Sequence, residues 1–541
     1  MLPSPSEQSH TGGRRQRPAI ATAVVLAVGS MCCPQASAFV VPGSSMSPMI
    51  RSAGESVSGA FTPTVNARMS VWQSGAAERR RLRSALRMVA AETEVATSPA
   101  TGASPVGGPL RIGMFGGGTV GGGVYEICEQ ARNEDSTSFD KKTFFQKLGC
   151  DSEIVKICVR DSKKARDFTV ESKTEVVTDY DAILNDDSIN CVVELMGGVT
   201  DAKDVVFGAI RRNKHVITAN KALVAAYLGE IQELLKEHPG VTFGYEAAVC
   251  GGIPIIATLQ NDYPGDKILK ASVCGIMNGT TNFMLSKMEA EGADYGDVLK
   301  EAQDLGYAEA DPTADVEGLD VQAKIALLTK LAFGATVSSD SVPCQGISTL
   351  TKVDFEYAKM MRSTIKLLGT AMLSPDGGKL SVFVSPVLVP LSHPIASTRG
   401  PGNIVSVDSK NMGTASFSGP GAGRYPTANS VVNDLVRLGV GKVGSPFPFD
   451  KEWELETDFT AGFYLRITCK DELGIIKRVG ELAANNGVSI HAILQNPIED
   501  PSNVDFVVTT DPCRQSQIDK LSSAIGKEKW ANSKPLILSL L

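Results

Sequence analysis

The sequence predicts an α/β protein whose first folded domain is built on a parallel sheet. Residues 110–115, LRIGMF, form a short apolar strand that runs into the glycine-rich turn GGGTVG at 116–121, and a helical pattern follows over 124–130. Short apolar strands at 191–195 and 216–218 then alternate with helical segments. Strands that alternate with helices are typical of a parallel sheet that is covered by helices on both faces.

The glycines of this turn are spaced as G-x-G-x-x-G between a strand and a helix, which is the context in which the motif binds a dinucleotide. The first glycine permits a tight turn, the second lets the backbone approach a pyrophosphate, and the third lets helix and strand pack closely. The free N–H groups of the helix N-terminus attract the phosphates. The expected cofactor contacts in this turn are Gly116, Gly118, Thr119, Val120 and Gly121.

A second strand, 153–159, ends in Arg160 and Asp161. The residue at this strand end meets the ribose of the cofactor. Arg160 would face an additional 2′-phosphate, which favours NADP(H), whereas Asp161 keeps NAD open as the alternative. Because ligands bind beyond the carboxyl ends of parallel strands, Thr218 and Lys221 are also expected to face the cofactor.

The composition excludes several other classes of protein. With 541 residues the chain has room for about three domains. Its net charge of −7 does not indicate a nucleic-acid-binding surface. The eleven cysteines show no C-x-x-C spacing and there are only five histidines, so no structural zinc site is expected and the cysteines fit a reducing compartment.

The amino-terminal part reads as a targeting region. Three arginines between residues 14 and 17 precede an apolar run, 19–31, which ends in the sequence ASAF at 36–39. The run is too short for a membrane span, and the following segment is rich in Ser and Arg and poor in acidic residues as far as Arg87. This layout resembles the two-part plastid presequence of algae, with simple secretion as the alternative. Residues 1–108 are therefore expected to be presequence and linker, and no membrane segment is expected in the mature protein.

The densest chemistry lies at 302–324, AQDLGYAEADPTADVEGLDVQAK. Asp311-Pro312 reads as the start of a helix that continues through 325–333. Asp320 and Lys324 are four residues apart and share one face of this helix, although such a pair is commonly a solvated surface pair. The segment fits A-x3-G-Y-A-x2-D-P-x2-D-V-x-G-x-D-x3-K, which resembles the signature of homoserine dehydrogenases.

The resemblance covers about residues 110–445 and includes TANKAL at 218–223 and CGIMNGTTNF at 274–283. It implies that Lys324 donates the proton, with Lys221 as second candidate or as electrostatic support. Glu309 and Asp320 would hold the substrate ammonium, and Asp320 would also orient Lys324. Gly306 and Gly423 join the expected cofactor contacts.

A loop after the strand predicted at 243–248 is the expected cation site. In homoserine dehydrogenases the matching loop can bind sodium through one glutamate and several carbonyl oxygens, while a purely structural turn is the alternative. The ligands that this resemblance implies are Glu246, Val249, Gly251 and Ile253.

The tail, from about residue 460 to 541, reads strand, turn, helix, strand, and then strand and helix again. It resembles an ACT domain, a small βαββαβ module that binds amino acids. The resemblance implies regulation by an end-product amino acid, most plausibly threonine; an oligomerisation unit without a ligand is the alternative.

The predicted architecture is a Rossmann domain over 109–245 with a return segment near 429–445, an α+β substrate-binding and dimerisation domain over 246–428, and the ACT domain over 460–541. The resemblance implies reversible NAD(P)H-dependent reduction of L-aspartate 4-semialdehyde to L-homoserine by a homodimer or homotetramer. A different nicotinamide oxidoreductase of a small amino or hydroxy acid, or a non-catalytic amino-acid sensor, are the alternatives.

Overall fold

The computed structural model describes residues 108–133, 150–263, 266, 268–374, 376–447 and 449–541, all of them within the unit Ser98–Leu541. The predicted presequence therefore falls outside the described residues, apart from residue 108. Among the helices of the described ranges, none combines the length and apolarity needed to cross a bilayer.

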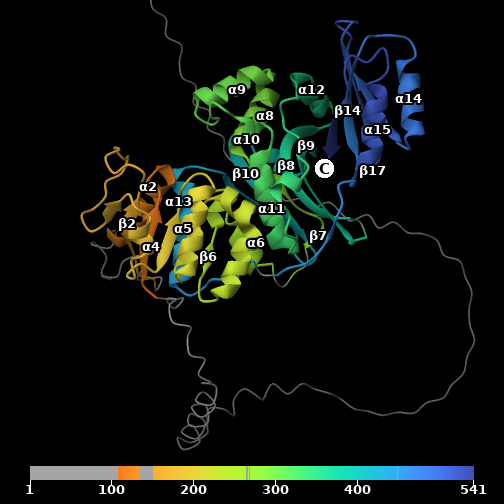
Figure 1. The fold of residues 1–541 in the computed structure, drawn as a ribbon. Helices are drawn as coiled ribbons and strands as arrows, with labels where there is room; N and C mark the ends of the chain where they lie inside the picture. Colours follow the sequence, from red (N-terminus) through yellow and green to blue (C-terminus); the bar gives the residue numbers. More distant parts are fainter. Residues whose placement is uncertain (1–107, 134–149, 264–265, 267, 375, 448) are drawn as a thin grey trace, which may run out of the picture. The chain divides into compact units, whose positions relative to one another are not determined.

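The first sheet has six parallel strands in the order β3-β2-β1-β4-β5-β6, which is the order of a Rossmann domain. Figure 1 shows its strands flanked by helices. The strands, in chain order, are β1 (Leu110–Phe115), β2 (Ser152–Cys158), β3 (Glu175–Val177), β4 (Cys191–Glu194), β5 (His215–Thr218) and β6 (Phe243–Gly244). The helices between them are α2 (Thr119–Asn133), α4 (Asp181–Leu184), α5 (Thr200–Arg211) and α6 (Lys221–Glu237).

The glycine turn between β1 and α2 has the geometry that its sequence predicts. Gly116 has a φ of 111°, a conformation that a side chain disfavours. A Cβ on Gly121 would lie 2.1 Å from the carbonyl oxygen of Gly116, so only glycine lets the helix approach the turn this closely. Helix α13 (Arg424–Gly439), which follows the second sheet in the chain, packs against α2.

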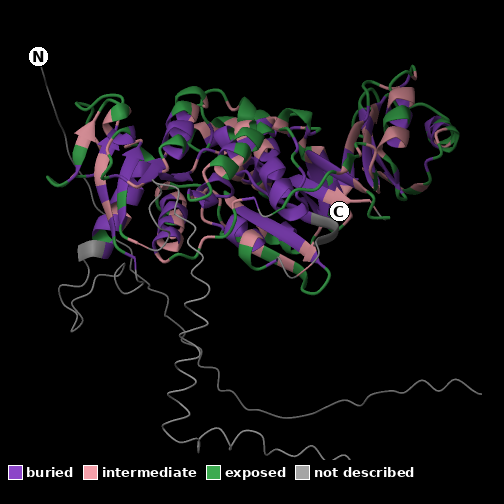
Figure 2. Cartoon of the chain, turned by 60° about the horizontal axis from the view of Figure 1, so that its bottom comes forward, coloured by how far each residue is buried: buried purple, intermediate pink, exposed green. Residues whose placement is uncertain are grey.

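The second sheet has ten strands and is mainly antiparallel. Its path begins β11-β10-β7-β8-β9, and the helices α8, α11 and α12 pack against β8. Figure 2 shows buried residues concentrated in the strands and on the helix faces that cover them. These strands are β7 (Ile268–Ile276), β8 (Ser363–Leu373), β9 (Lys379–Pro390), β10 (Gly402–Ser409) and β11 (Gly413–Pro420). The associated helices are α7 (Ile255–Asn261), α8 (Gly279–Glu291), α9 (Tyr295–Asp304), α10 (Thr313–Val316), α11 (Leu319–Phe333) and α12 (Lys352–Met360).

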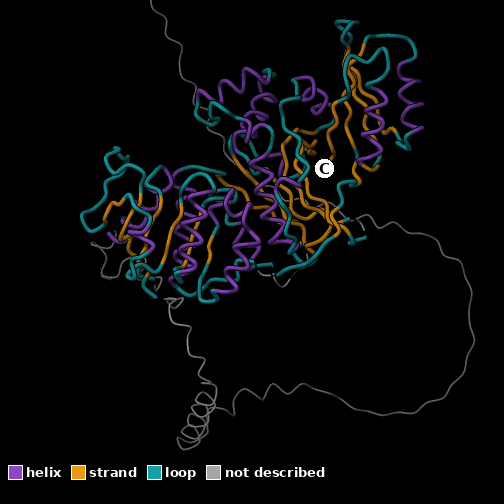
Figure 3. Tube along the Cα trace, viewed as in Figure 1, coloured by secondary structure: helices purple, strands orange, loops and turns teal. Residues whose placement is uncertain are grey.

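The tail has the βαββαβ order that its sequence predicts, and Figure 3 shows its strands and helices beside the C-terminus. Its strands continue the second sheet in the order β18-β14-β16-β15, because β18 pairs in parallel with β9. The main elements are β14 (Phe463–Cys469), α14 (Ile475–Asn485), β15 (Ile490–Gln495), β16 (Val504–Thr510), α15 (Gln515–Ile525) and β18 (Leu536–Leu540). Short strands are β12 (Glu454–Leu455), which pairs with β9, and β13 (Thr460–Ala461) with β17 (Cys513–Arg514).

Two predicted elements differ from the structure. The helix expected from Asp311 through Phe333 is interrupted at Gly318, whose φ of 85° lies in the left-handed region, so α10 ends before α11 begins. The strand expected at 243–248 ends after Gly244 and is followed by a 3₁₀ turn, Glu246–Ala248. In both places the predicted type of element is present, but it is shorter or more interrupted than the sequence pattern predicts.

Asp354 joins α12 to the tail. Its side chain is fully buried. Its Oδ1 accepts hydrogen bonds from the Tyr464 hydroxyl at 2.9 Å and from Arg466 Nε at 2.8 Å, both on β14. Its Oδ2 accepts from the backbone N–H of Thr351 at 2.9 Å. One carboxylate therefore satisfies donors from both parts of the molecule.

We expect Asp354→Ala to lower the free energy of unfolding by about 3–5 kcal/mol, because it leaves the Arg466 charge and the Tyr464 hydroxyl without their buried acceptor. Urea denaturation of the full chain measures this loss. The matched control is Glu356→Ala, which removes an exposed carboxylate from the same helix and should cost less than about 1 kcal/mol. Equal losses in the two variants would contradict this role.

Candidate active site

The two expected lysines meet at one buried carboxylate. Lys324 Nζ lies 2.7 Å from Asp320 Oδ2, and Lys221 Nζ lies 3.0 Å from Asp320 Oδ1. Lys221 is the first residue of α6 in the Rossmann domain, whereas Asp320 and Lys324 belong to α11. The Asp320–Lys324 pair is therefore not a solvated surface pair, and it lies where the two sheets' helices come together.

Burial and charge act against each other at this cluster. Burial alone would raise the pKa of Asp320, but the two ammonium groups hold it well below its usual range. Burial likewise disfavours the charge on Lys324, yet the Asp320 carboxylate outweighs it and raises the pKa of Lys324. Lys324 is therefore an ammonium that can donate a proton, while the Lys221 side chain remains 41% exposed and can reach a ligand.

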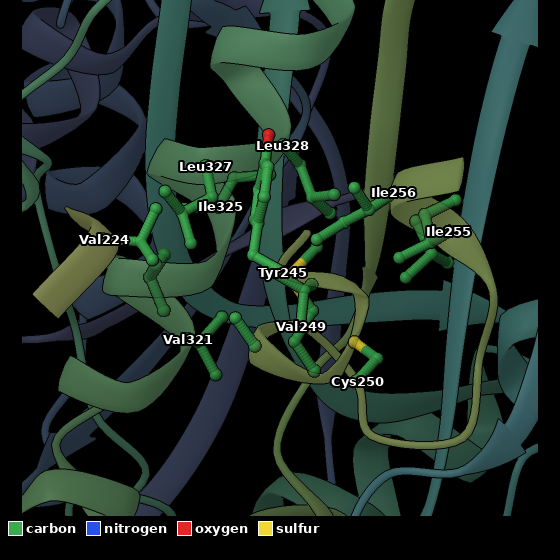
Figure 4. Close-up of a cluster of buried hydrophobic side chains, with 14 of the residues drawn as sticks. Val224, Tyr245, Val249, Cys250, Ile255, Ile256, Val321, Ile325, Leu327 and Leu328 are labelled. Atoms are coloured by element: carbon green, nitrogen blue, oxygen red, sulfur yellow. The ribbon is translucent and has the colours of Figure 1, made fainter. Parts of the chain in front are cut away.

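Helix α11 holds these groups in place because it is buried on almost all sides. Figure 4 shows Val321, Ile325 and Leu328 of this helix within a cluster that also contains Val224 of α6 and Tyr245. Each of these side chains is at most 1% exposed. A helix that is packed on most of its sides cannot rotate about its own axis. Asp320 and Lys324, four residues apart, are therefore held on one face of the helix.

The first turn of α8 supplies the remaining polar contacts. Asn278 caps this helix, and its Nδ2 donates to Asp320 Oδ2 at 2.9 Å and to Asp315 Oδ1 at 2.7 Å. Lys324 Nζ also donates to the carbonyl oxygen of Met277 at 2.6 Å. Burial raises the pKa of Asp315, the second carboxyl group at this amide.

A buried network at the ends of β4 and β5 positions Lys221. Glu194 accepts from the Thr218 hydroxyl at 2.5 Å and from the backbone N–H of Met196 at 2.7 Å. Asn220 caps α6 by accepting from Leu223 N, and its Nδ2 donates to the carbonyl oxygen of Gly198. Thr218, an expected cofactor contact, is thus fully buried and used in this network.

Three other expected residues lie in loops near these elements. Glu309 is exposed, and its backbone oxygen accepts from Gln303 Nε2 at 3.1 Å. The same loop is tied to α8 because the Thr280 hydroxyl donates to the carbonyl oxygen of Tyr307. Gly306 has a φ of 75° and Gly423 a φ of 126°, so both occupy conformations that favour glycine. No contact between Glu309 and Asp320 or Lys324 is present in the described residues.

The expected cation loop has a structural explanation. Glu246 accepts from the backbone N–H groups of Ile256 at 3.0 Å and Ala257 at 2.9 Å, at the start of α7, and Arg437 Nη1 lies 3.2 Å from it. The carbonyl oxygens of Gly251 and Ile253 accept from the Ser430 hydroxyl and from Ile255 N. Groups of three His, Cys, Asp or Glu side chains suited to a metal are absent from the described residues. These donors engage three of the four expected ligands, Glu246, Gly251 and Ile253, and the sodium site, with Val249 as its fourth expected ligand, stays a prediction.

A cavity of about 590 Å³ borders the glycine turn. Its lining includes Gly116, Gly118 and Thr119, together with Arg160 and Lys164 from the loop after β2. The Asp161 carboxylate accepts from Lys163 N at 2.8 Å and so closes a local turn. The cavity has the glycine backbone and cations that an anionic dinucleotide needs.

Together these groups suit hydride transfer to a carbonyl. An electron pair that arrives at a carbonyl carbon leaves negative charge on the oxygen, and an adjacent ammonium can stabilise that charge and supply the proton. Sequence reasoning missed Asn278 as a site residue, along with Glu194 and Asp315. Local sequence signals for two of them existed, because Asp315 is a fixed position of the 302–324 pattern and Asn278 precedes a helical run. For Glu194 the only signal was its place at the end of a strand.

Known proteins resemble this chain in sequence. A model of the homoserine dehydrogenase NAD-binding domain matches residues 116–246, and a model of homoserine dehydrogenase matches 254–436. The homoserine dehydrogenase of Bacillus subtilis is 40% identical over 397 residues, 72% of this chain and 88% of that protein. The Synechocystis enzyme of the same name is 37% identical, with 80% of this chain and 99% of that protein covered.

Solved structures of homoserine dehydrogenases also match the fold of this chain. A homoserine dehydrogenase from Thiobacillus denitrificans matches with a TM-score of 0.72 and 33% identity, covering 81% of this chain and 99% of that one. The Staphylococcus aureus enzyme matches with a TM-score of 0.62 and 28% identity, covering 80% and 99%.

The Glu246 region should make stability depend on pH. Burial, together with the neighbouring Asp434 carboxyl, raises the pKa of Glu246 to about 7, and burial raises the pKa of Asp434 to about 6. A raised folded-state pKa stabilises the fold at low pH and loses that contribution as the pH rises through it. We expect the free energy of unfolding to fall by about 1 kcal/mol per pH unit as the pH rises from about 4 to about 7.

The comparison of wild type with Glu246→Gln by denaturation at a series of pH values measures this effect, because the variant has lost the titrating group and its slope should be flatter. Glu233→Gln, at a side chain that is 70% exposed, is the matched control and should keep the wild-type slope. Parallel slopes for wild type and Glu246→Gln would rule the interpretation out.

Lys324→Ala should lower kcat by about 10²–10⁴, because it removes the proton donor, while the cofactor Kd stays unchanged. Steady-state rates and a cofactor titration test both parts. Lys300→Ala, on the exposed face of α9, is the control that should keep both values. Near-normal turnover of the Lys324 variant would remove this side chain from the chemistry.

Proposed function

The chain belongs to the homoserine dehydrogenase family, and from this premise we propose how its residues perform the reaction. The protein is an NAD(P)-dependent oxidoreductase that interconverts L-aspartate 4-semialdehyde and L-homoserine. The observation that supports the residue assignment best is the buried carboxylate of Asp320 between Lys324 and Lys221.

The bound nicotinamide supplies or accepts the hydride. In the reducing direction Lys324 donates a proton to the oxygen of the aldehyde as charge develops there. Asp320 holds Lys324 through a 2.7 Å contact and keeps it charged. Lys221 adds a second positive charge at 3.0 Å from the same carboxylate and stabilises the developing alkoxide.

The substrate's ammonium group needs carboxylate partners. Asp320 and Glu309 are the residues assigned to it. Glu309 lies on the exposed loop that is anchored to α8 through Thr280 and Tyr307. Such an exposed carboxylate can turn towards a bound substrate without breaking any hydrogen bond of the described structure, and the exposed loop gives the substrate its entry.

The cofactor is assigned as NADP(H). Arg160 and Lys164 both line the cofactor cavity, and Arg166 folds their loop by donating to the carbonyl oxygens of Asp161, Ser162 and Lys164. The Asp161 carboxylate is directed to the backbone of Lys163, which leaves it poorly placed for a ribose hydroxyl. Asp161 and Asp167 also line the cavity, but the three cations Arg160, Lys164 and Arg166 outnumber them and favour the cofactor that carries the 2′-phosphate.

The tail is assigned as an ACT domain that regulates the enzyme through an amino acid, with threonine as the expected effector, in a homodimer or homotetramer. Its support is the βαββαβ order and the direct continuation of its sheet into β9. A change at the tail can reach the catalytic helix because α11 packs on β9.

Initial rates of homoserine oxidation with NADP and with NAD test the function and the cofactor assignment together. We expect the wild type to prefer NADP and Arg160→Ala to lower the ratio of kcat/KM values, NADP over NAD, by about 10-fold or more, since a charge-assisted bond is lost. Arg211→Ala, at an arginine outside the cavity lining, should leave the ratio unchanged. No oxidation of homoserine with either cofactor would refute the function, and an unchanged ratio in Arg160→Ala would refute the role of Arg160.

A further inference from the structure

Three glycines follow one another in α2, at residues 121–123, and the dinucleotide motif accounts only for the first of them. Glycine is a poor residue inside a helix. A Cβ on Gly122 would lie 2.6 Å from Arg424 Nη2 and 2.8 Å from Phe168 Cδ1. A Cβ on Gly123 would lie 3.0 Å from the carbonyl oxygen of Arg424. The two additional glycines therefore make room for Arg424, the first residue of α13.

The guanidinium group of Arg424 joins two carboxylates from different elements. Its Nε donates to Glu126 Oε2 on α2 at 3.1 Å, and its Nη1 donates to the Asp167 carboxylate, in the loop after β2. The Tyr425 hydroxyl donates to the same Glu126 oxygen at 3.1 Å. Glu126 thus holds the Arg424 side chain, which is only 16% exposed, in a position from which it reaches Asp167.

Asp167 belongs to the wall of the cofactor cavity, which it lines together with the three cations of the same loop. The next residue, Phe168, is buried and packs on Tyr125 of α2 with ring centroids 5.5 Å apart. Because Phe168 anchors the chain at this point, the backbone of Asp167 stays beside the cavity. The Asp167 carboxylate, whose side chain is 61% exposed, therefore faces either Arg424 or the ligand in the cavity.

The charge of this carboxylate bears on one cofactor more than on the other. A 2′-phosphate carries nearly two negative charges at neutral pH, and a carboxylate beside it repels it. A carboxylate in the same place suits the ribose hydroxyls of the cofactor that lacks the phosphate. An unpaired Asp167 would therefore weaken NADP(H) and spare NAD(H), and the ion pair with Arg424 offsets the charge that causes this difference.

We propose that Arg424 is a positioning residue for cofactor selectivity, which holds the Asp167 carboxylate away from the 2′-phosphate and so preserves the preference for NADP(H). The proposal rests on the cofactor assignment made above and adds to it a residue outside the cavity lining. Arg424 acts through Asp167. A role as a mere brace between α13 and α2 is the competing explanation, and it predicts no difference between the two cofactors.

Equilibrium titration of the full chain with NADPH and with NADH, followed by the fluorescence of the bound nicotinamide, gives both Kd values without turnover. We expect Arg424→Gln to raise the Kd of NADPH by about 5- to 10-fold and that of NADH by less than about 2-fold. Asp167→Asn alone should keep the wild-type ratio of the two Kd values, because the carboxylate that it removes is already paired.

The double variant Arg424→Gln/Asp167→Asn separates the charge effect from bracing. It has lost the same contacts to α2 as the single Arg424 variant, but no carboxylate remains at this position to repel the phosphate. We therefore expect its ratio of Kd values to return to within about 2-fold of the wild type. Arg424→Lys keeps the positive charge and should also stay close to the wild-type ratio.

Arg111→Gln is the matched control, because it removes an arginine from another ion pair of the same domain. Arg111 Nη1 lies 3.2 Å from Glu153, and the two residues stand at the beginnings of β1 and β2, whereas ligands bind beyond the carboxyl ends of the strands. Both Kd values should match those of the wild type. The thermal unfolding midpoints of all variants report any loss of bracing separately.

Three outcomes would overturn the proposal. The first is that Arg424→Gln weakens NADPH and NADH equally or leaves both unchanged. The second is that the double variant keeps the altered ratio. The third is that Asp167→Asn alone binds NADPH several-fold more tightly, since the carboxylate would then not be offset in the wild type; this outcome can be observed even if Arg424→Gln does not fold. Tighter binding of NADH than of NADPH by the wild type would refute the cofactor assignment by itself, whereas the change from wild type to variant measures the role of Arg424.

Discussion

The molecule depends on one buried carboxylate that is shared by two domains. Asp320 lies between Lys221 of the Rossmann domain and Lys324 of its own helix, at 3.0 and 2.7 Å. A buried carboxylate is costly without partners, and two ammonium groups around one carboxylate leave a net positive charge. That surplus is what an oxygen acquiring negative charge requires. The contact that joins the domains is therefore also the one that leaves positive charge at the candidate site.

The supporting contacts show how the fold fixes this arrangement. Asn278 donates to Asp320 and Asp315 with the same amide nitrogen, so the first turn of α8 is tied to both α10 and α11. On the other side, Asn220 caps α6 directly before Lys221. Two helix caps thus set the distance between the lysines and the carboxylate. Because caps are local and the buried helix cannot rotate, the geometry requires no ligand to form.

Sequence patterns predicted most of this arrangement where the signal was local. The glycine spacing at 116–121 gave the Rossmann turn, and the four-residue spacing of Asp320 and Lys324 gave their common face. Spacing could not reveal that Lys221 contacts Asp320, because that contact depends on how two domains pack. The unbroken helix was predicted wrongly because Gly318 reads as a mild helix breaker until its φ of 85° is known. The cation site expected at Glu246 stays a prediction, because a carboxylate before a glycine turn looks the same whether it caps α7 or binds an ion.

The break at Gly318 is better understood as a requirement than as a defect. A continuous helix from Thr313 to Phe333 would place Asp315 and Asp320 about 140° apart, since each helical residue advances about 100°. With the break, both carboxyls reach the same Asn278 amide. The break is therefore what lets two carboxyls from successive helices share one amide nitrogen, an arrangement that a single straight helix does not allow.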